Sequence, residues 1–336
     1  MHLVALVESP EHVCCRYRLR AFMPVWDRAG HTLELRSLPR GWWDKLALGR
    51  DLVHADAVIV QRKLLHPWQI SLLHRRVKRL IFDYDDAVWS RDSYSKRGFT
   101  DLRRLTRFRA MVKSSDLVIA GNRYLADQAR QWVPADQVQV IPTCVQPELY
   151  PISLHRPSDT VEMVWIGSRS TLQGIERIAG MLDRLGQRLP FLRLKLICDR
   201  FLEFPNLPVI PCPWSSDTEG IELANSAIGV SWIPDDPWSR GKCGLKVLQY
   251  MAAGLPVVAN PVGVHPEMIV HGETGLLAES AEEWQDAISL LANDPQLRRR
   301  MGEAGRDRLE THYSVRAGAD RWLTALNRLS HERLSA

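Results

Sequence analysis

The chain is poor in cysteine, and its cysteines form no recognisable pattern. There are six in 336 residues, two of them adjacent at Cys14 and Cys15 and the other four scattered singly. No Cys-x-x-Cys pair occurs, which argues against a zinc site and against a thioredoxin-like redox centre. We therefore expect reduced, buried thiols, as in cytosolic proteins.

Long apolar runs are also absent. No stretch approaches the roughly 18 consecutive apolar residues that a membrane-spanning helix requires. The first apolar run, 3–7, ends at Glu8, too early for the apolar region of a secretory signal peptide. The sequence thus predicts a soluble, cytoplasmic protein that at most touches the inner face of a membrane.

Motifs that would identify several other classes of protein are missing. No predicted strand is followed by Gly-x-Gly-x-x-Gly, which disfavours a dinucleotide-dependent oxidoreductase. No nucleic-acid-binding signature occurs, and nothing repeats with a period of about 20–50 residues. We expect neither a nucleic acid partner nor a repeat architecture.

Positive charge is present, and it is unevenly distributed. The net charge is +5, and basic residues gather between Arg91 and Lys113, at Lys96, Arg97, Arg103, Arg104, Arg107 and Arg109. This patch suits an anionic lipid or a phosphorylated acceptor, or it is the solvated face of a helix. An amphipathic stretch further upstream favours either a peripheral contact with an anionic membrane or the core of a first domain. It comprises Arg40, Trp42, Trp43, Lys45, Leu46 and Leu48.

Short apolar runs alternate with helical patterns along most of the chain. The predicted strands are 3–7, 32–38, 57–60, 80–82 and 117–120, then 161–166, 192–197, 209–210, 227–231 and 256–259. Helices are predicted at 16–29, 171–189 and 245–253, and through most of 281–334. A proline-bearing loop at 142–157 separates the two series. This order predicts an α/β fold of two Rossmann-like, doubly wound domains with parallel sheets.

Ligands of such sheets bind beyond the carboxyl ends of the strands, and we expect the site in the cleft between the two domains. The turn Gly167-Ser168-Arg169 follows strand 161–166 and opens a helix. Its glycine lets a phosphate approach the backbone, the helix start supplies amide donors, and Arg169 adds a charge-assisted contact. The alternative is an ordinary capped helix start, with Ser170 or Thr171 as the capping residue.

A second candidate loop runs from Asp235 into the helix at 245–253. Lys242 and Lys246 are four residues apart, so both are expected on one face near the helix start, with Arg240 just before them. Cations at a helix N-terminus oppose the helix dipole unless an anion joins them. This arrangement favours a diphosphate ligand over solvated lysines.

From Gly244 onwards the sequence resembles family four of the glycosyltransferases. The matching segments are 244–259, 261–263, 271–277, Trp284, 297–302, Gly305-Arg306 and Tyr313-Ser314, in the family's order. The first half resembles the family only through its strand–helix alternation and the turn Ala29-Gly30-His31. The resemblance implies a GT-B fold, with an acceptor domain at 1–145 and a donor domain at 150–314. The final helix, 315–336, would pack back onto the acceptor domain.

The resemblance also implies a retaining transfer from a nucleotide-diphosphate sugar, without a metal or another cofactor. By position, Arg169, Lys242 and Lys246 would hold the donor diphosphate and stabilise negative charge on the leaving group. The further donor-binding candidates are Gly167, Ser168, Asp235, Arg240, Gly244, Leu245 and Gln249.

In one respect the chain departs from the family. Two glutamates separated by seven residues are common in this loop and helix, and here the positions hold Gly241 and Gln249. Gln249 can still form a hydrogen bond with a ribose hydroxyl, whereas Gly241 cannot replace a carboxylate that contacts the donor sugar. Asp235 and Asp236 are candidate substitutes for that carboxylate.

Three carboxylates follow strand 80–82 in the first half. Asp83, Asp85 and Asp86 are expected to face the acceptor, and Asp85 would accept a proton from its hydroxyl or orient it. Arg16, after the first strand, would contact an anionic acceptor or the donor phosphate, or it packs in the core or at the surface. The aspartates could instead cap turns, or form the Asp-x-Asp metal site of a GT-A glycosyltransferase, which would leave the motifs of the second half unexplained.

The predicted function is therefore sugar transfer from a nucleotide sugar to a glycan, lipid-linked or small-molecule acceptor. Two alternatives remain open. The missing glutamates suit a non-catalytic protein that binds nucleotide sugars, and the fold also suits another GT-B enzyme such as a nucleotide-sugar epimerase. Turnover with an acceptor, or release of free nucleotide without one, distinguishes the three.

Overall fold

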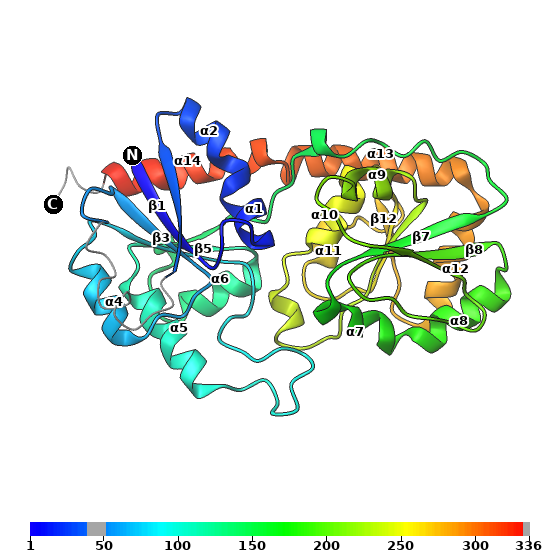
Figure 1. Cartoon of the computed structure of the whole chain (residues 1–336), viewed down its shortest axis with the longest axis horizontal. Coiled ribbons are helices and arrows are strands. Elements are labelled where there is room, and N and C mark those ends of the chain that lie inside the picture. Colours follow the sequence, from blue (N-terminus) through cyan, green and yellow to red (C-terminus); the bar gives the residue numbers. More distant parts are fainter. Residues whose placement is uncertain (39–51, 332–336) are drawn as a thin grey trace. The chain divides into compact units, whose positions relative to one another are not determined.

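The computed structural model describes residues 1–38 and 52–331 (Figure 1). The amphipathic stretch predicted at 40–48 lies outside the described residues. The chain divides into two compact units. Unit 1 comprises residues 1–144, 236–243 and the chain from Val315 on, and unit 2 comprises 145–235 and 244–314. Segment 236–243 thus belongs to unit 1, whereas we expected the second domain to run unbroken from 150 to 314.

Unit 1 is built on a six-stranded parallel sheet with the order β2-β1-β3-β4-β5-β6. The strands are β1 His2–Val7, β2 Thr32–Ser37, β3 Ala57–Gln61, β4 Leu80–Tyr84, β5 Leu117–Ala120 and β6 Val138–Val140. All residues of β3, β4 and β5 are buried, as expected where helices cover both faces of a parallel sheet. The strand order reverses between β1 and β3, and such a switch point is where open sheets bind ligands.

Helices flank this sheet. They are α1 Val13–Arg18, α2 Met23–Arg28, α4 Pro67–His74, α5 Leu102–Ser114, α6 Arg123–Arg130 and α14 Val315–His331, with short 3-10 turns at Arg20–Phe22, Ala135–Gln137 and Ser239–Gly241. The helix predicted at 16–29 is in fact two helices. Pro24 occupies the first turn of α2, where a missing N–H is tolerated, and its ring prevents α1 from continuing through it.

The C-terminal helix α14 is part of the core of unit 1. The ring of Trp322 packs against Phe22 and Trp26, with centroids 6.4 and 5.2 Å apart. Gly318 allows α14 to come close, because a Cβ there would lie 2.5 Å from the sulfur of Cys144. These aromatic contacts cover one face of the sheet at β1, β3 and β5.

Unit 2 is built on a second six-stranded parallel sheet, with the order β12-β11-β10-β7-β8-β9. The strands are β7 Val161–Ile166, β8 Leu192–Ile197, β9 Val209–Cys212, β10 Ile228–Ser231, β11 Val257–Ala259 and β12 Gly275–Leu277. The strand order reverses between β7 and β10, so the switch point of unit 2 lies between these two central strands. The two sheets confirm the predicted α/β architecture. Two short strands, β6 and β12, were not predicted.

The helices of unit 2 are α7 Arg169–Arg177, α8 Ala179–Arg188, α9 Glu219–Ala224, α10 Leu245–Ala252, α11 His265–Met268, α12 Ala281–Asn293 and α13 Pro295–His312, and Pro147–Leu149 forms a 3-10 turn. Ser280 and Glu283 begin α12 with a reciprocal capping box, and Asp294 caps α13 ahead of Pro295. Among the described helices, none has the length and apolar character needed to cross a membrane.

Candidate functional site

The turn between β7 and α7 opens a helix directly after the strand, with Ser168 as the capping residue where the sequence suggested Ser170 or Thr171. A Cβ on Gly167 would lie 2.7 Å from the ring of Trp165 and 2.8 Å from Oγ1 of Thr171, so only glycine fits. Thr171 Oγ1 accepts from the backbone N–H of Ser168 at 3.3 Å and donates to its carbonyl at 3.0 Å, and α7 begins at Arg169, two residues before Thr171. The side chains of Ser168 and Arg169 are exposed. The backbone N–H of Arg169 is already occupied by Asp199, at 2.8 Å.

Lys246 lies beside this turn. It is the second residue of α10, and its Nζ lies 3.4 Å from Thr171 Oγ1 and 4.9 Å from the ring centroid of Trp165. The helix begins after Gly244, whose φ of +64° favours glycine, and no side chain among the described residues caps its first turn. A half-buried ammonium group and uncapped backbone amides together suit an anionic group.

A buried histidine lies behind Lys246. His265 Nδ1 lies 2.8 Å from the carbonyl oxygen of Asn260, and its Nε2 lies 3.1 Å from Ser231 Oγ. A carbonyl only accepts, so Nδ1 carries the proton and Nε2 accepts from the serine hydroxyl. Burial and nearby Lys246 lower the pKa of His265 to about 4, so the ring is neutral at physiological pH. Sequence reasoning missed this pair, although Ser231 ends β10 and Asn260 directly follows β11.

Gln249 lies in an internal polar network. Its side chain is buried, and Nε2 lies 3.3 Å from the hydroxyl of Tyr150 and 3.4 Å from Oε2 of Glu219. Trp214 Nε1 donates to the same carboxylate at 2.9 Å. The amide of Gln249 thus faces a carboxylate, and a glutamate at this position would place two buried carboxylates in contact.

Lys242 and Lys246 do not share a helix face, so that prediction was wrong. α10 begins only at Leu245, after the left-handed Gly244, and the backbone of Lys242 is extended, with φ −69° and ψ 142°. Lys242 belongs to unit 1, where its Nζ lies 2.9 Å from Oδ1 of Asp86 and 4.5 Å from the ring centroid of Trp238. The contact with Asp86 is an ion pair without hydrogen-bond alignment. Of the predicted phosphate-binding cations, unit 2 therefore holds Arg169 and Lys246 alone.

The remaining polar residues of this loop divide between structural and exposed positions. Asp236 is buried, and its Oδ1 accepts from the backbone N–H of Ser239 at 2.8 Å and from the Ser93 hydroxyl at 3.1 Å. It is therefore committed to folding the loop. Arg240 and Asp235 are exposed.

At Gly241 a side chain has no room. A Cβ there would lie 2.7 Å from the backbone nitrogen of Ala87 and 2.8 Å from its Cβ. The loop thus packs closely on the segment after β4 at the position where the resembled family commonly has a glutamate.

Asp83 does not reach the surface of unit 1, so its predicted contact with an acceptor was wrong. Its carboxylate is fully buried and lies 3.0 Å, through both oxygens, from Nε of Arg18, which is also buried. Gln61 Nε2 donates to it at 3.3 Å, and Arg18 also donates to the carbonyl of Ile141 at 3.0 Å. The side chain is enclosed because β4 continues to Tyr84, which turns Asp83 toward α1.

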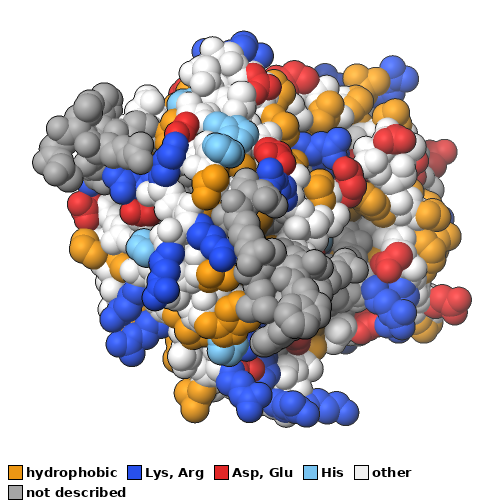
Figure 2. All heavy atoms as spheres, turned by 60° about the vertical axis from the view of Figure 1, so that its left-hand side comes forward, with side chains coloured by type: hydrophobic (Ala, Val, Ile, Leu, Met, Phe, Trp, Pro, Cys, Tyr) orange, Lys and Arg blue, Asp and Glu red, His pale blue; other side chains and the backbone are white. Residues whose placement is uncertain are grey.

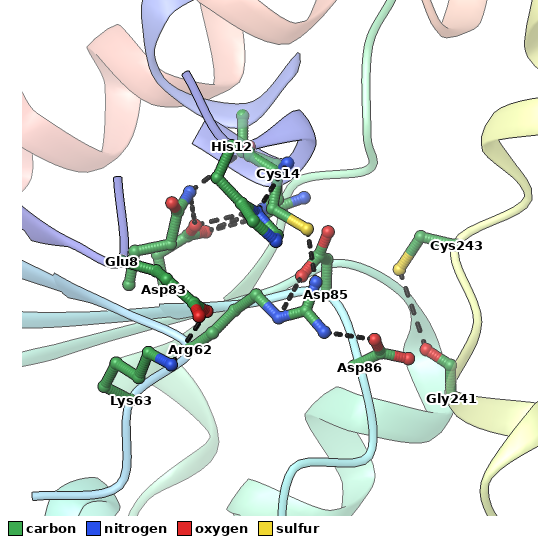
Figure 3. A network of polar contacts seen from close by, with 12 residues as sticks. Glu8, His12, Cys14, Arg62, Lys63, Asp83, Asp85, Asp86, Gly241 and Cys243 are labelled. Atoms are coloured by element: carbon green, nitrogen blue, oxygen red, sulfur yellow. Dashed lines mark hydrogen bonds and ion pairs between the residues drawn. The ribbon is translucent and has the colours of Figure 1, made fainter. Parts of the chain in front are cut away.

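Asp85 and Asp86 follow β4 and meet an arginine that was not predicted (Figure 3). Arg62 directly follows β3 with a φ of +58°, its Nε lies 3.3 Å from Asp85 Oδ1, and its Nη2 forms an ion pair with Asp86. Burial alone would raise the pKa of Asp85, but Arg62 and Arg18 together hold it below its usual value. Asp85 is therefore a carboxylate at neutral pH. Arg62 could have been found from the sequence because it lies just after a predicted strand, and ligands of open sheets bind beyond the carboxyl ends of the strands.

Further side chains lie at the switch point between β1 and β3. Lys63 Nζ lies 2.7 Å from Oε2 of Glu8, and its hydrogen bond lowers the pKa of that carboxyl. His12 caps α1, accepting from the backbone N–H of Cys14 at 3.3 Å. Arg16 is half-buried on α1, with its guanidinium 5.0 Å from the ring centroid of Tyr17. Within the described ranges, no group of three or more histidine, cysteine or acidic side chains could hold a metal ion.

Comparison with known proteins gives a family match for one segment of the chain. Residues 237–308 match the family described as Glycosyl transferases group 1. D-inositol 3-phosphate glycosyltransferase of Corynebacterium aurimucosum is 44% identical over 66 residues, which are 19% of this chain and 16% of that protein. Alpha-maltose-1-phosphate synthase of Mycolicibacterium smegmatis is 24% identical over 260 residues, covering 66% of this chain and 65% of that protein. The chain therefore matches less than two thirds of the length of these curated relatives.

Solved structures show the same architecture over nearly the whole chain. Sucrose-phosphate synthase from Thermosynechococcus elongatus has a TM-score of 0.77 at 16% identity, covering 99% of this chain and all of that one. Anabaena HepE, in complex with UDP and glucose, has a TM-score of 0.68 at 16% identity, covering 98% of this chain and all of that one. The chain has a two-domain α/β fold of the GT-B type, and its residues 237–308 match the family described as Glycosyl transferases group 1.

Proposed function

We propose that this protein is a glycosyltransferase that moves a sugar from a nucleotide-diphosphate sugar to an acceptor. The observation that carries the proposal is the position of Lys246 beside the Gly167 turn, at the switch point of unit 2. There a cation, a glycine-lined turn and the start of α10 converge, as a diphosphate requires.

The donor would bind through its diphosphate. Lys246 and Arg169 would neutralise the charge that grows on the diphosphate as the bond to the sugar breaks, and fixed cations lower the barrier because they need no reorganisation. The turn at Gly167 and Ser168 and the α10 start at Gly244 and Leu245 would supply close backbone contacts. In this proposal the transfer retains the anomeric configuration, as in the resembled family, and requires neither metal nor cofactor.

The acceptor would bind to unit 1. Asp85 follows β4, next to the switch point of that sheet, is ionised at neutral pH, and is held in place by Arg62. A carboxylate so placed accepts a hydrogen bond from a hydroxyl and orients it. Asp86 and Arg16 would flank the acceptor, and Lys242 is held by Asp86.

The proposal is tested by binding before turnover. Calorimetry and thermal shift would be run with nucleoside diphosphates and their sugars, with and without EDTA, beginning with UDP-sugars because HepE was solved with UDP and glucose. The variants are Lys246→Ala and, as matched control, Lys113→Ala on the exposed face of α5. Metal-independent binding lost only in Lys246→Ala is expected, followed by NMR of the product for its anomeric configuration. A folded protein that binds none of these ligands would overturn the donor site.

One observation favours a non-catalytic protein that binds nucleotide sugars. No side chain fits at Gly241, so no carboxylate reaches the donor sugar from that position. The two functions separate in one assay, because the non-catalytic protein binds a nucleotide sugar but releases no nucleotide diphosphate with any acceptor. An epimerase would release the diphosphate without an acceptor.

We also propose a peripheral contact with an anionic membrane surface through α5. Exposed basic side chains gather on α5 and the preceding loop, at Lys96, Arg97, Arg103, Arg104, Arg109 and Lys113. Figure 2 shows a face of the molecule on which Lys and Arg side chains lie among hydrophobic and acidic ones. Leu102, at the start of α5, is 71% exposed beside them. Co-sedimentation with phosphatidylglycerol vesicles should fall with Arg103→Glu/Lys113→Glu and not with Arg300→Glu, an exposed arginine of α13. Equal binding of all three proteins would contradict this contact.

A further inference from the structure

A cavity of about 440 Å³ lies within unit 2, away from the residues of the donor-site proposal. Its walls are segment 151–160, which precedes β7, the end of α9 with the residues that follow it, and Arg298 of α13. This volume is in the range of small-molecule sites. Neither the function proposed above nor the family match accounts for it.

The cavity is lined by buried polar side chains and by exposed side chains of both polar and aliphatic kinds. Four lining residues are buried polar side chains, Ser153, His155, Ser226 and Arg298. Three lining residues at the rim are exposed aliphatic side chains, Ile152, Leu154 and Ile221. Such a lining suits a ligand with one charged end and one apolar side.

Arg298 supplies a buried cation with an unused donor. The side chain is 2% exposed, and its Nη1 donates to the carbonyls of Leu291 and Ala292 at 2.6 and 3.0 Å, at the end of α12. Its Nε is buried and has no hydrogen-bond partner. A buried charged donor left without a partner is costly, and an anion in the cavity would satisfy it.

His155 supplies a second unpartnered atom. Its Nε2 lies 2.7 Å from the carbonyl of Gly254 and must donate to it, which leaves Nδ1 buried and without a partner. The residue has a φ of +46°, an uncommon conformation that clusters at ligand sites. Burial lowers the pKa of His155, and the positive charges of Arg298 and Arg299 lower it further. The hydrogen bond to Gly254 and the charge of Glu303 oppose this without reversing it, so the ring is neutral when no ligand is bound.

The acidic residue in the lining does not oppose an anion. Glu162 is paired with Lys195, whose Nζ lies 2.9 Å from its Oε2. Lys195 is also paired with Glu222, at 3.3 Å. Arg156, at the rim, adds a second positive charge to that of Arg298.

We propose that this cavity binds a small organic oxyanion, whose phosphate or carboxylate is held by Arg298 and His155 and whose remainder lies against the exposed aliphatic side chains. Binding makes a charge-assisted hydrogen bond to Arg298 Nε. It also draws a proton to Nδ1 of His155, because the anion favours the charged ring. The site is independent of sugar transfer.

Calorimetry on the full chain tests the site with inorganic phosphate, glucose 6-phosphate and citrate, and with glucose as the neutral control. Phosphate and carboxylate probes together separate the two kinds of oxyanion. Wild type is expected to bind at least one of the anions, with an affinity about tenfold or more weaker in Arg298→Gln and in His155→Asn. Asparagine is chosen because it tolerates the left-handed backbone of position 155.

Two matched variants complete the experiment. Arg193→Gln also removes an arginine whose Nη1 donates to two backbone carbonyls, at 2.7 and 2.8 Å, but it lies outside the cavity and should bind as wild type does. Lys246→Ala should also retain binding, because it alters only the donor site, so the two proposals can fail separately. If Arg298→Gln does not fold, the effect of His155→Asn on anion binding tests the proposal.

Repeating the titration in two buffers of different ionisation enthalpy measures proton uptake. Wild type should take up part of a proton near neutral pH, and His155→Asn should take up less. The proposal is overturned if folded wild type binds none of the three anions at millimolar concentration, or if binding is unchanged in His155→Asn. In the first case water alone fills the cavity, and in the second the anion binds without His155.

Discussion

Gln249 Nε2 and Glu219 Oε2 lie 3.4 Å apart inside unit 2, where Tyr150 and Trp214 also donate to the Glu219 carboxylate. The amide at position 249 is therefore the complement of a buried acid that lies 30 residues earlier in the chain. This contact explains the departure from the family's glutamate: the carboxylate is still present in the network, but α9 carries it rather than α10.

Gln249→Glu should destabilise the protein by about 3 kcal/mol, because it brings two carboxylates into contact where neither is solvated. Urea unfolding at pH 7 measures the loss, which should shrink at acid pH as one carboxyl is protonated. Adding Glu219→Gln should restore most of it, since the pair again holds one acid and one amide. If the double variant loses as much stability as the two single variants lose together, the two side chains do not interact and the contact is contradicted.

Gly241→Ala should cost about 1–3 kcal/mol of stability, because the added Cβ would meet the backbone nitrogen of Ala87 at 2.7 Å. The matched control is Gly180→Ala in α8, where the nearest atom to an added Cβ is a flexible arginine terminus at 3.7 Å. That variant should be neutral or stabilising by up to about 1 kcal/mol. Thermal unfolding of both variants against wild type measures the difference, and equal stability of the two would argue against the close packing.

The sheets could be predicted from the sequence because the strands are buried on both faces. β5 and β7 have the predicted boundaries, since β5 is a run of apolar residues and β7 is apolar except at Glu162, and a glycine follows each. β6 and β12 have only three residues each, too few for a pattern to show. The turn at Gly167 was also predictable, because glycine, a capping serine and a helix follow one another locally.

The errors arose where contacts join distant residues. The sequence predicted that the strand ends at Phe82, which placed Asp83 in the loop after it. In the structure β4 continues to Tyr84, and Asp83 pairs with Arg18, which lies 65 residues earlier in the chain. Lys242 was placed on a helix by its spacing, but the left-handed Gly244 separates it from that helix. No local pattern marks such pairings, and ending β4 two residues too early placed Asp83 outside the strand in which its side chain is buried.

Asp83→Asn should destabilise the protein by about 3–5 kcal/mol, because it leaves the buried guanidinium of Arg18 without a counter-charge. Glu11→Gln is the control, since its pair with Arg20 is exposed and should contribute little. Denaturant unfolding measures both. A loss of activity in Asp83→Asn with unchanged stability would restore a direct role for Asp83 in acceptor binding.

Asp85→Asn should behave differently from Asp83→Asn if Asp85 orients the acceptor. The asparagine keeps the size of the side chain but loses the carboxylate, so kcat should fall by about a hundredfold while donor binding is unchanged. Glu8→Gln changes an acid with an exposed side chain that also follows a strand of the same sheet, and as the matched control it should retain activity. A transfer assay with the sugar nucleotide identified by calorimetry measures kcat, and wild-type turnover in Asp85→Asn would remove this residue from the mechanism.

The stability of the protein should fall as pH drops from about 6.5 to 4, in part because of His265. Its pKa is lowered to about 4 in the folded protein, so the unfolded chain binds a proton first and acid favours unfolding. The stabilisation is complete above pH 6.5 and is lost progressively toward pH 4, by about 3 kcal/mol over that range. Urea unfolding at several pH values should give a shallower decline for His265→Gln than for wild type, and an unchanged decline for His74→Gln, an exposed histidine of α4. If His265→Gln declines as steeply as wild type, the ring is not held neutral by Ser231 and Asn260, and the bridge between β10 and β11 behind Lys246 must be stabilised in another way.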